Sequence, residues 1–186
     1  MRTVQYKRKK QGRTNYKNRL NLLVSRQNRV VIRKSLTGIQ IQIVEYLPDG
    51  DKVLLSVHSR ELKSFGLPLV SGNIPVAYLT GLLCGKKALK KNISSGIVDL
   101  GLQRAHPKGK LFAAVKGLLD SGFTIPCDES VLPSEAVLNG ELLESYAQKI
   151  KGSSKPVFTA FSKNGVDAST ISKVYADVKS KILAEK

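Results

Sequence analysis

The sequence predicts an α/β protein with one mixed sheet, an extended basic N-terminal arm and a helical C-terminal appendage. Strand-like segments follow one another between residues 29 and 58, helix-like and strand-like segments then alternate as far as residue 126, and no acidic residue precedes Glu45. Successive strands joined by short turns form an antiparallel three-strand meander, to which a helix-strand-helix-strand run adds parallel strands. We expect a basic arm and short helix at 1–27, an α/β core at 28–126, and an acidic strip with a helical extension at 127–186.

The arm and short helix come first. Residues 1–13 are polar and basic and include Gly12, so we expect them to be extended or disordered in the free protein. Thr14 or Asn15 is a suitable N-cap for a short helix that ends near Ser25. The apolar side chains that we expect this helix to pack against the sheet are Leu20, Leu23 and Val24.

The three strands of the meander are predicted from β-branched residues and from alternation. Arg29–Lys34 is centred on a Val-Val-Ile run, and Thr37–Leu47 alternates isoleucine with glutamine. Both patterns are typical of strands, and a period of two indicates a sheet with one buried face. Pro48-Asp49-Gly50 predicts a turn, after which Lys52–Val57 returns as the third strand.

The helices and remaining strands follow from capping signals. Asn73 is a suitable N-cap for a helix that reaches about Leu89, with Pro75 tolerated in its first turn. Beyond residue 126 we expect helices near 139–151 and 168–184, separated by a Gly-Ser-Ser-Lys-Pro linker. The other core elements are a strand at Ile97–Leu100, a helix at Lys110–Ser121 ended by Gly122 as its left-handed cap, and a short strand at Phe123–Ile125.

The charge of the chain indicates a polyanionic partner. Lys and Arg number 31 against 14 Asp and Glu, for a formal net charge of +17. The cations are concentrated in residues 1–34, with 12 Lys and Arg and no acid, and in residues 86–116, with eight against one. Residues 117–150 form the acidic strip, with six acids against Lys149. Such a distribution favours nucleic acid, and we expect no membrane partner because residues 1–13 lack the apolar face that membrane binding requires.

Catalysis is not expected. His58 and His106 are isolated, so we expect no metal, no cofactor and no small-molecule substrate. The order of elements is similar to the ribonuclease H-like layout, whose nucleases hold two metals between several carboxylates on adjacent strands. Here Glu45 ends the second strand and Asp99 lies on the fourth, while the first strand carries only cations. A degenerate nuclease is therefore the weakest alternative.

Cations interspersed with aromatic and amide side chains favour RNA. Lys and Arg neutralise phosphates, and Tyr6 and Tyr16 could stack on unpaired bases. Alternatively, Tyr16 is a core aromatic of the short helix. The second group of cations could bind RNA or complement the C-terminal dipole of its own helix. Its members are Lys86, Lys87, Lys90 and Lys91.

Several segments together resemble one family. They are "GRTNYKNRLNLLVSRQNRVVIRKS" at Gly12–Ser35, "QIVEY" at Gln42–Tyr46, "HSREL" at His58–Leu62, "GNIPVAYLTGLLCGKKAL" at Gly72–Leu89 and "LDSGFTIP" at Leu119–Pro126. In this order they resemble the 5S-rRNA-binding family of large-subunit ribosomal protein eighteen in its archaeal form, whose eukaryotic relative is large-subunit protein five. Asn15 stands where relatives often carry Asp.

The resemblance implies a non-enzymatic structural component of the large ribosomal subunit in the cytoplasm. It would bind 5S rRNA and help attach it to 23S rRNA in the central protuberance, beside other 5S-associated proteins. The alternative is a general RNA-binding or ribosome-assembly factor of similar fold, which would bind many RNAs about equally. The expected RNA contacts are Arg2, Tyr6, Lys7, Arg8, Lys9, Lys10, Gly12, Arg13, Thr14, Asn15, Tyr16, Arg19, Arg26, Arg29, Arg33 and Lys34, with His58, Ser59, Arg60, Asn73 and the four lysines at 86–91 in addition.

Overall fold

The computed structural model describes residues 3–150, 161 and 170–185. A mixed sheet with strand order β3-β2-β1-β4 lies at its centre. The strands are β1 (Arg29–Lys34), β2 (Ile39–Glu45), β3 (Lys52–His58) and β4 (Ile97–Asp99). β1 pairs antiparallel with β2 and parallel with β4, and β2 pairs antiparallel with β3. The predicted α/β class and the antiparallel meander are confirmed.

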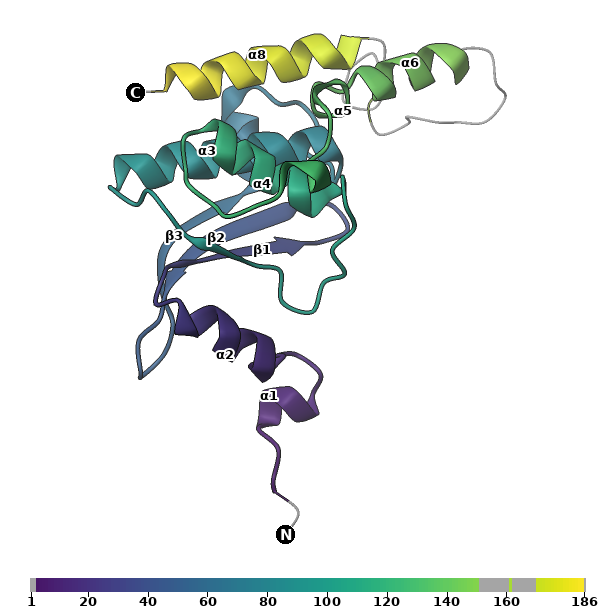
Figure 1. The fold of residues 1–186 in the computed structure, drawn as a ribbon. Helices are drawn as coiled ribbons and strands as arrows, with labels where there is room; N and C mark the ends of the chain where they lie inside the picture. The colour runs from purple at the N-terminus through teal and green to yellow at the C-terminus, as the bar shows by residue number, and fades with distance from the viewer. Residues whose placement is uncertain (1–2, 151–160, 162–169, 186) are drawn as a thin grey trace.

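Helices lie on both sides of the sheet (Figure 1). In the part of the chain that the structure describes, they are α1 (Lys7–Lys10), α2 (Tyr16–Val24), α3 (Ile74–Lys90), α4 (Lys110–Asp120), α5 (Glu135–Leu138), α6 (Glu141–Ile150) and α8 (Ile171–Ala184), with 3₁₀ helices η1 (Ser59–Phe65) and η2 (Glu129–Val131). α3 and α4 cover one face, and α8 lies over them; α2 lies on the opposite side with α1 beyond it (Figure 1). None of these helices is long and apolar enough to cross a membrane.

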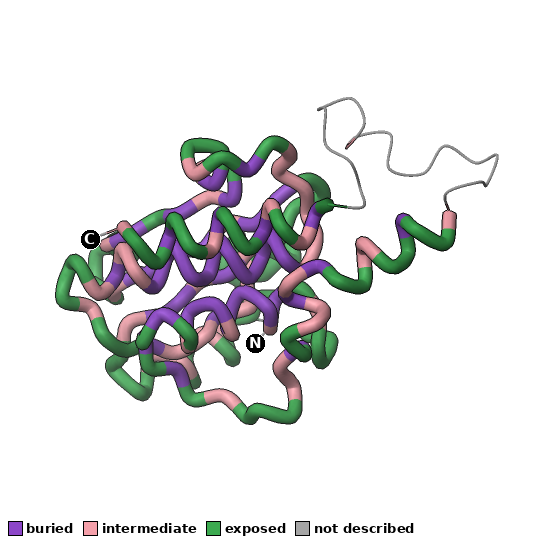
Figure 2. The backbone as a smooth tube through the Cα atoms, turned by 90° about the horizontal axis from the view of Figure 1, so that it is seen from above, coloured by how far each residue is buried: buried purple, intermediate pink, exposed green. Residues whose placement is uncertain are grey.

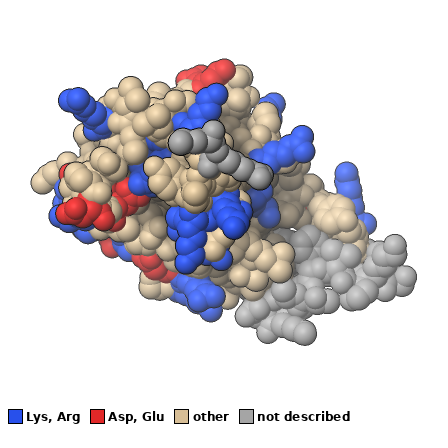
Figure 3. Space-filling view, turned by 90° about the horizontal axis from the view of Figure 1, so that it is seen from below, with Lys and Arg blue, Asp and Glu red and all other residues tan. Residues whose placement is uncertain are grey.

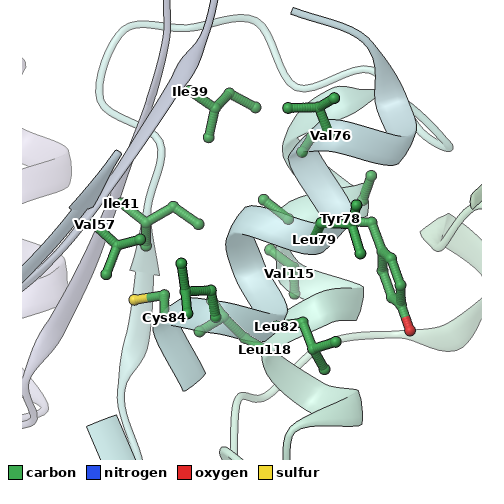
Figure 4. Packing of buried hydrophobic residues seen from close by; sticks show 14 of the residues in the cluster. Ile39, Ile41, Val57, Val76, Tyr78, Leu79, Leu82, Cys84, Val115 and Leu118 are labelled. Carbon is green, nitrogen blue, oxygen red and sulfur yellow. The ribbon is translucent and has the colours of Figure 1, made fainter. Parts of the chain in front are cut away.

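The core lies between the sheet and the α3–α4 layer. The alternation in β2 places Ile39, Ile41 and Ile43 on the buried face, where each is at most 2% exposed. Ile41 and Val57 point from the sheet toward Leu79 and Leu82 of α3 and Leu118 of α4 (Figure 4). Removal of this apolar surface from water is the main stabilising contribution to the fold.

α3 begins where the sequence predicts. The Asn73 side chain accepts a hydrogen bond from the Val76 amide at 3.1 Å, and Pro75 lies in the first turn. α3 packs against α4 at backbone contact distance: a Cβ on Gly81 would lie 2.1 Å from the Ala114 carbonyl oxygen. Glycine is therefore required sterically at this helix crossing, where no side chain fits.

α8 packs by one face of the helix. Its buried residues recur at the spacing of that face, and Figure 2 shows buried and exposed segments alternating along it. They are Ile171, Tyr175, Val178 and Ile182. The Tyr175 hydroxyl also accepts a hydrogen bond from Asn73 Nδ2 at 2.8 Å, which joins α8 to the start of α3.

One prediction beyond β4 is corrected. Phe123–Ile125 is not a strand: it makes one isolated parallel bridge, between Ser95 and Thr124. Pro126 follows directly and has no N–H to extend the ladder. The helix expected near 139–151 is present as α6, and the one-turn helix α5, which Gly140 with φ +84° separates from α6, was not predicted. The helix expected at 168–184 is present as α8 within the described residues, whereas the predicted linker at 152–156 lies outside them.

The arm is also corrected, since residues 1–13 were expected to be extended or disordered. Lys7–Lys10 forms one helical turn, and Gly12 closes it with φ +63°. The Gly12 amide donates to the Lys9 carbonyl and the Arg13 amide to the Arg8 carbonyl, which is the pattern of a Schellman C-terminus. A left-handed glycine at this position thus stabilises a local turn even in a fully exposed basic segment. Arg2 lies outside the described residues.

Candidate nucleic-acid interface

α2 faces the sheet with a polar side. Asn15, Asn18, Arg19 and Leu22 are spaced three and four residues apart, which places them on one face of the helix, and all four line a groove against the sheet. Leu20 and Val24, expected to pack inward, are instead 64% and 74% exposed. The prediction was wrong for these two residues, whereas Leu23, the third residue of the predicted face, is half-buried.

Three arginines and two aspartates form one network across α2 and the sheet. Arg19 makes two 2.8 Å hydrogen bonds to the carboxylate of Asp51, which lies just before β3. Arg29 on β1 donates to the same carboxylate at 2.6 Å and to Asp99 on β4 at 2.9 Å. Arg33 bonds the Asp99 carbonyl oxygen at 2.7 Å and its carboxylate at 3.4 Å. Two carboxylates thus join three arginines, one from α2 and two from β1.

The ion pair between Arg19 and Asp51 shifts the pKa values of both groups. Burial alone would raise the pKa of Asp51, but hydrogen bonds from Arg19 and Arg29 outweigh burial and hold it below the ordinary 3.8. The hydrogen bond to Asp51 correspondingly raises the pKa of Arg19. Both groups are therefore charged at neutral pH, so an ionic contact joins α2 to the sheet.

Between α2 and the sheet lies a groove of about 650 Å³, which we call the arginine groove. Its floor is the outer face of β1, β2 and β3, and its rim is formed by the end of α1, by α2 and by the segment after β4. The residues that line it are Arg8, Arg13, Thr14, Asn15, Asn18, Arg19, Asn21, Leu22, Arg29, Val31, Arg33, Gln42, Val44, Asp51, Val53, Val98, Asp99, Leu100, Gly101 and Leu102.

The arm extends the cationic surface beyond the groove. Lys7, Arg8, Lys9 and Lys10 are exposed, and Arg8 donates through Nε to Thr14 Oγ1 at 2.9 Å, which fixes the arm relative to α2. The rings of Tyr6 and Tyr16 lie 5.0 Å apart, tilted by 40°. Tyr6 is 71% exposed, so the pair forms an aromatic surface among cations. Lys and Arg gather near the centre of this face of the molecule (Figure 3).

Several candidate residues have structural contacts. Asn15 caps α2 by accepting from the Asn18 amide, a task that Asn and Asp perform about equally. His58 caps η1, accepting from the Arg60 amide at 3.0 Å while its own amide donates to Glu61. Ser59 is 0% exposed and its hydroxyl accepts from the Ile39 amide. Ser59 has no surface to present to RNA in this structure; Arg60, Arg26 and Lys34 are exposed.

The lysines at the end of α3 are separate from the arginine groove and partly engaged. Lys87 pairs with Glu61 at 2.6 Å, Lys90 with Glu185 at 3.5 Å, and Lys91 donates to the Leu54 carbonyl at 2.9 Å. Lys87 and Lys90 also lie in the last turn of α3, where a cation complements the helix dipole. The structure therefore brings together the arm, α2 and β1 residues but not this second group.

Asp51 is the residue of the site that the sequence reading missed. It follows the Pro-Asp-Gly turn, and its partners Arg19 and Arg29 are 32 and 22 residues away in sequence. The available signal was the meander itself, which brings the β2–β3 turn to the end of the sheet where β1 begins. Among the described residues, no three His, Cys, Asp or Glu side chains gather in a way that could hold a metal ion.

Comparison with known proteins gives two findings. The family model described as ribosomal large subunit proteins 60S L5 and 50S L18 matches residues 2–98, which hold the arm, α2, β1 to β3 and α3. The protein of Methanococcus maripaludis named large ribosomal subunit protein uL18 is 38% identical to this chain, over 97% of this chain and 95% of its own length.

Proposed function

The chain belongs to the family of ribosomal large-subunit proteins 60S L5 and 50S L18, and from this premise we propose that it binds 5S rRNA and helps attach it to 23S rRNA in the central protuberance. It acts as a structural component of the large subunit in the cytoplasm, beside other 5S-associated proteins, and not as an enzyme. The observation that carries the proposal is that the basic arm and α2, which lie within the family match, line one groove with the outer face of the sheet.

The sheet supports a ribonuclease H-like arrangement as the underlying fold. The order β3-β2-β1-β4, with β4 parallel to β1 and the Ser95–Thr124 bridge parallel beyond it, is the order expected of that layout. In a nuclease of this layout, carboxylates at the sheet would hold metal ions. Here Asp99 is bonded to Arg29 and Arg33 instead, so its charge is neutralised by the protein itself.

The cations of the site divide into two roles. Arg29 is 3% exposed and bonded to two carboxylates, so it positions the sheet ends and α2 rather than contacting phosphate. The exposed cations of the arm carry the RNA contact, because a phosphate can approach them without displacing a buried ion pair. They are Lys7, Arg8, Lys9, Lys10 and Arg13.

We also propose that the chain is organised as an RNA-binding arm with a short helix (1–27), the α/β core (28–126) and an acidic, helical extension (127–186). α6 of the extension exposes Leu142 and Tyr146 beside acidic residues of its first turn. This composition suits contact with a basic neighbouring protein of the subunit, as the ribosomal role requires.

Competition binding tests the proposal. The full-length protein is titrated with 5S rRNA, tRNA and random RNA across a salt series. If roughly 6–10 phosphates are neutralised, log K falls with log salt by about 0.7–0.9 per phosphate for each RNA. A preference for 5S rRNA that persists at high salt supports the proposal. Equal affinities that fall together would replace it with a general RNA-binding role.

A further inference from the structure

We propose that the arginine groove holds a single unstacked nucleotide of RNA, with its base on the valine floor and its phosphate on the arginine rim. The inference rests on the proposed function and specifies which part of an RNA this surface takes: an extruded or loop nucleotide rather than a continuous duplex.

The floor of the groove carries apolar side chains from three strands, which suits contact with the face of a base. Val31, Val44 and Val53 come from three neighbouring strands and point to the outer face of the sheet. Val44 and Val53 are cross-strand partners, and Val53 is still 49% exposed. Val31 is half-buried and Val44 is buried beneath the floor, so Val53 supplies most of the accessible apolar surface. A surface that served only to neutralise duplex phosphates would gain nothing from an exposed valine at its centre. Unpaired bases, in contrast, are recognised through their faces.

The residues that line the groove include more arginines than aspartates. Five arginines and two aspartates line it, which leaves three formal positive charges. Asp51 and Asp99 engage Arg19 and Arg29, and Asp99 also contacts Arg33 at the longer distance of 3.4 Å. Arg8 and Arg13 make no ion pair with a residue that the structure describes, and Arg33 shares its carboxylate with Arg29, so these three are the cations open to a phosphate. The Arg33 side chain is 42% exposed and is held in place by the carbonyl oxygens of Ile32 and Asp99. A guanidinium fixed in this way binds phosphate with little loss of rotamer entropy.

Amide side chains between floor and rim could bond the edge of the base. Asn18 and Asn21 face the groove from α2, and Gln42 does so from β2. Gln42 donates through Nε2 to Ser56, so its oxygen remains to accept from an amino group. The volume of about 650 Å³ lies in the range, roughly 300–1,000 Å³, of pockets that hold small organic ligands. A double helix is too wide to enter it.

Mononucleotides and a filling variant test the inference. Methyl and amide chemical shifts of the full-length protein are followed by NMR during titration with AMP, GMP, CMP and UMP, and separately with inorganic phosphate. In Val53→Phe the new ring occupies the floor without changing any charge. The matched control is Ala176→Phe, which adds the same ring at an exposed position of α8, on the other side of the sheet and outside the residues that line the groove. Thermal melting checks that both variants fold.

The expected result is that nucleotides, but not phosphate alone, shift the methyl signals of Val31, Val44 and Val53. Val53→Phe should abolish these shifts and weaken 5S rRNA binding about fivefold or more, in line with the loss of one base contact, while Ala176→Phe does neither. Equal shifts with phosphate and nucleotide, or undiminished 5S rRNA binding by folded Val53→Phe, would overturn the inference and leave the proposed function intact. Loss of preference for 5S rRNA over tRNA in the unchanged protein would instead refute the proposed function.

Discussion

Asp51→Asn is the sharpest test of how α2 is held. The substitution keeps the size of the side chain but removes the charge that bonds both Arg19 and Arg29. The Arg19 pair has side chains 30% and 25% exposed, so solvent limits its contribution to about 0.5–1 kcal/mol. The bond from the buried Arg29 is worth about 1.5–3 kcal/mol, of which Asn retains a part as a neutral acceptor. We expect the free energy of unfolding to fall by about 2 kcal/mol.

The local effect of Asp51→Asn is separable from the global one. An isolated helix as short as α2 is not stable in water, so undocking exposes its amides to exchange. Losing about 1 kcal/mol at Arg19 increases the open population about fivefold. Hydrogen exchange of the α2 amides, measured beside urea denaturation, should therefore accelerate about fivefold. Asp49→Asn is the control, because Asp49 lies in the same turn and makes no ion pair with any residue that the structure describes.

Hydrogen exchange of the α2 amides should also depend on pH, and the direction follows from the pKa of Asp51. The pKa of Asp51 is lowered in the folded protein, so its contribution is complete above the ordinary value of 3.8 and is lost as pH falls through the lower folded value. The docking contribution should therefore disappear below pH 3.8 in the unchanged protein, while Asp51→Asn shows no such step. If Asp51→Asn exchanges like Asp49→Asn at neutral pH, α2 is held by something other than this carboxylate and the reasoning fails.

Three further predictions follow. Arg13→Ala should lower the slope of log K against log salt for 5S rRNA by about one, since one phosphate contact is removed; an unchanged slope, measured by filter binding, would contradict the assignment of Arg13 to the RNA surface. Gly81→Ala should destabilise the protein by about 1–3 kcal/mol in urea denaturation, because its methyl group would lie 2.1 Å from the Ala114 carbonyl oxygen. Asp99→Ala should cost about 3 kcal/mol in the same assay by leaving buried Arg29 with one carboxylate, and any magnesium-dependent RNA cleavage that this variant loses would refute the non-enzymatic assignment.

The parts of the fold that were predictable have local signals. β1 was predicted to the residue because a Val-Val-Ile run between cations has one plausible conformation. The start of α3 was predicted because a capping Asn and a first-turn Pro specify the same boundary. Phe123–Ile125 failed for the complementary reason. Its composition favours a strand, but a strand also needs a neighbour with which to pair, and only Thr124 has one.

The orientation of α2 was not predictable from its own residues. Leu20 and Val24 carry the stronger apolar signal, yet they face outward because Arg19 lies on the opposite side and bonds to Asp51. A hydrophobic pattern decides which face of a helix packs only when burial contributes more than the competing contacts. For a helix as short as α2, two or three side chains decide which face packs against the sheet. One of the groups that they contact, Asp51, belongs to the turn after β2.

The same limit applies to predicting which cations bind RNA. The segment before Glu45 lacks carboxylates, and this favoured a surface devoted to RNA. Arg29 and Arg13 are alike in that segment, but Arg29 is buried between two carboxylates supplied by β4 and the β2–β3 turn, whereas Arg13 is exposed. The absence of carboxylates from a segment shows only that no acid is close to its cations in sequence. Acids from other segments can still lie beside those cations in the folded protein. Cations that lack such partners, or share one while remaining partly exposed as Arg33 does, are available to phosphate. This is why the arm and the groove rim, rather than the buried Arg29, carry the proposed contact with RNA.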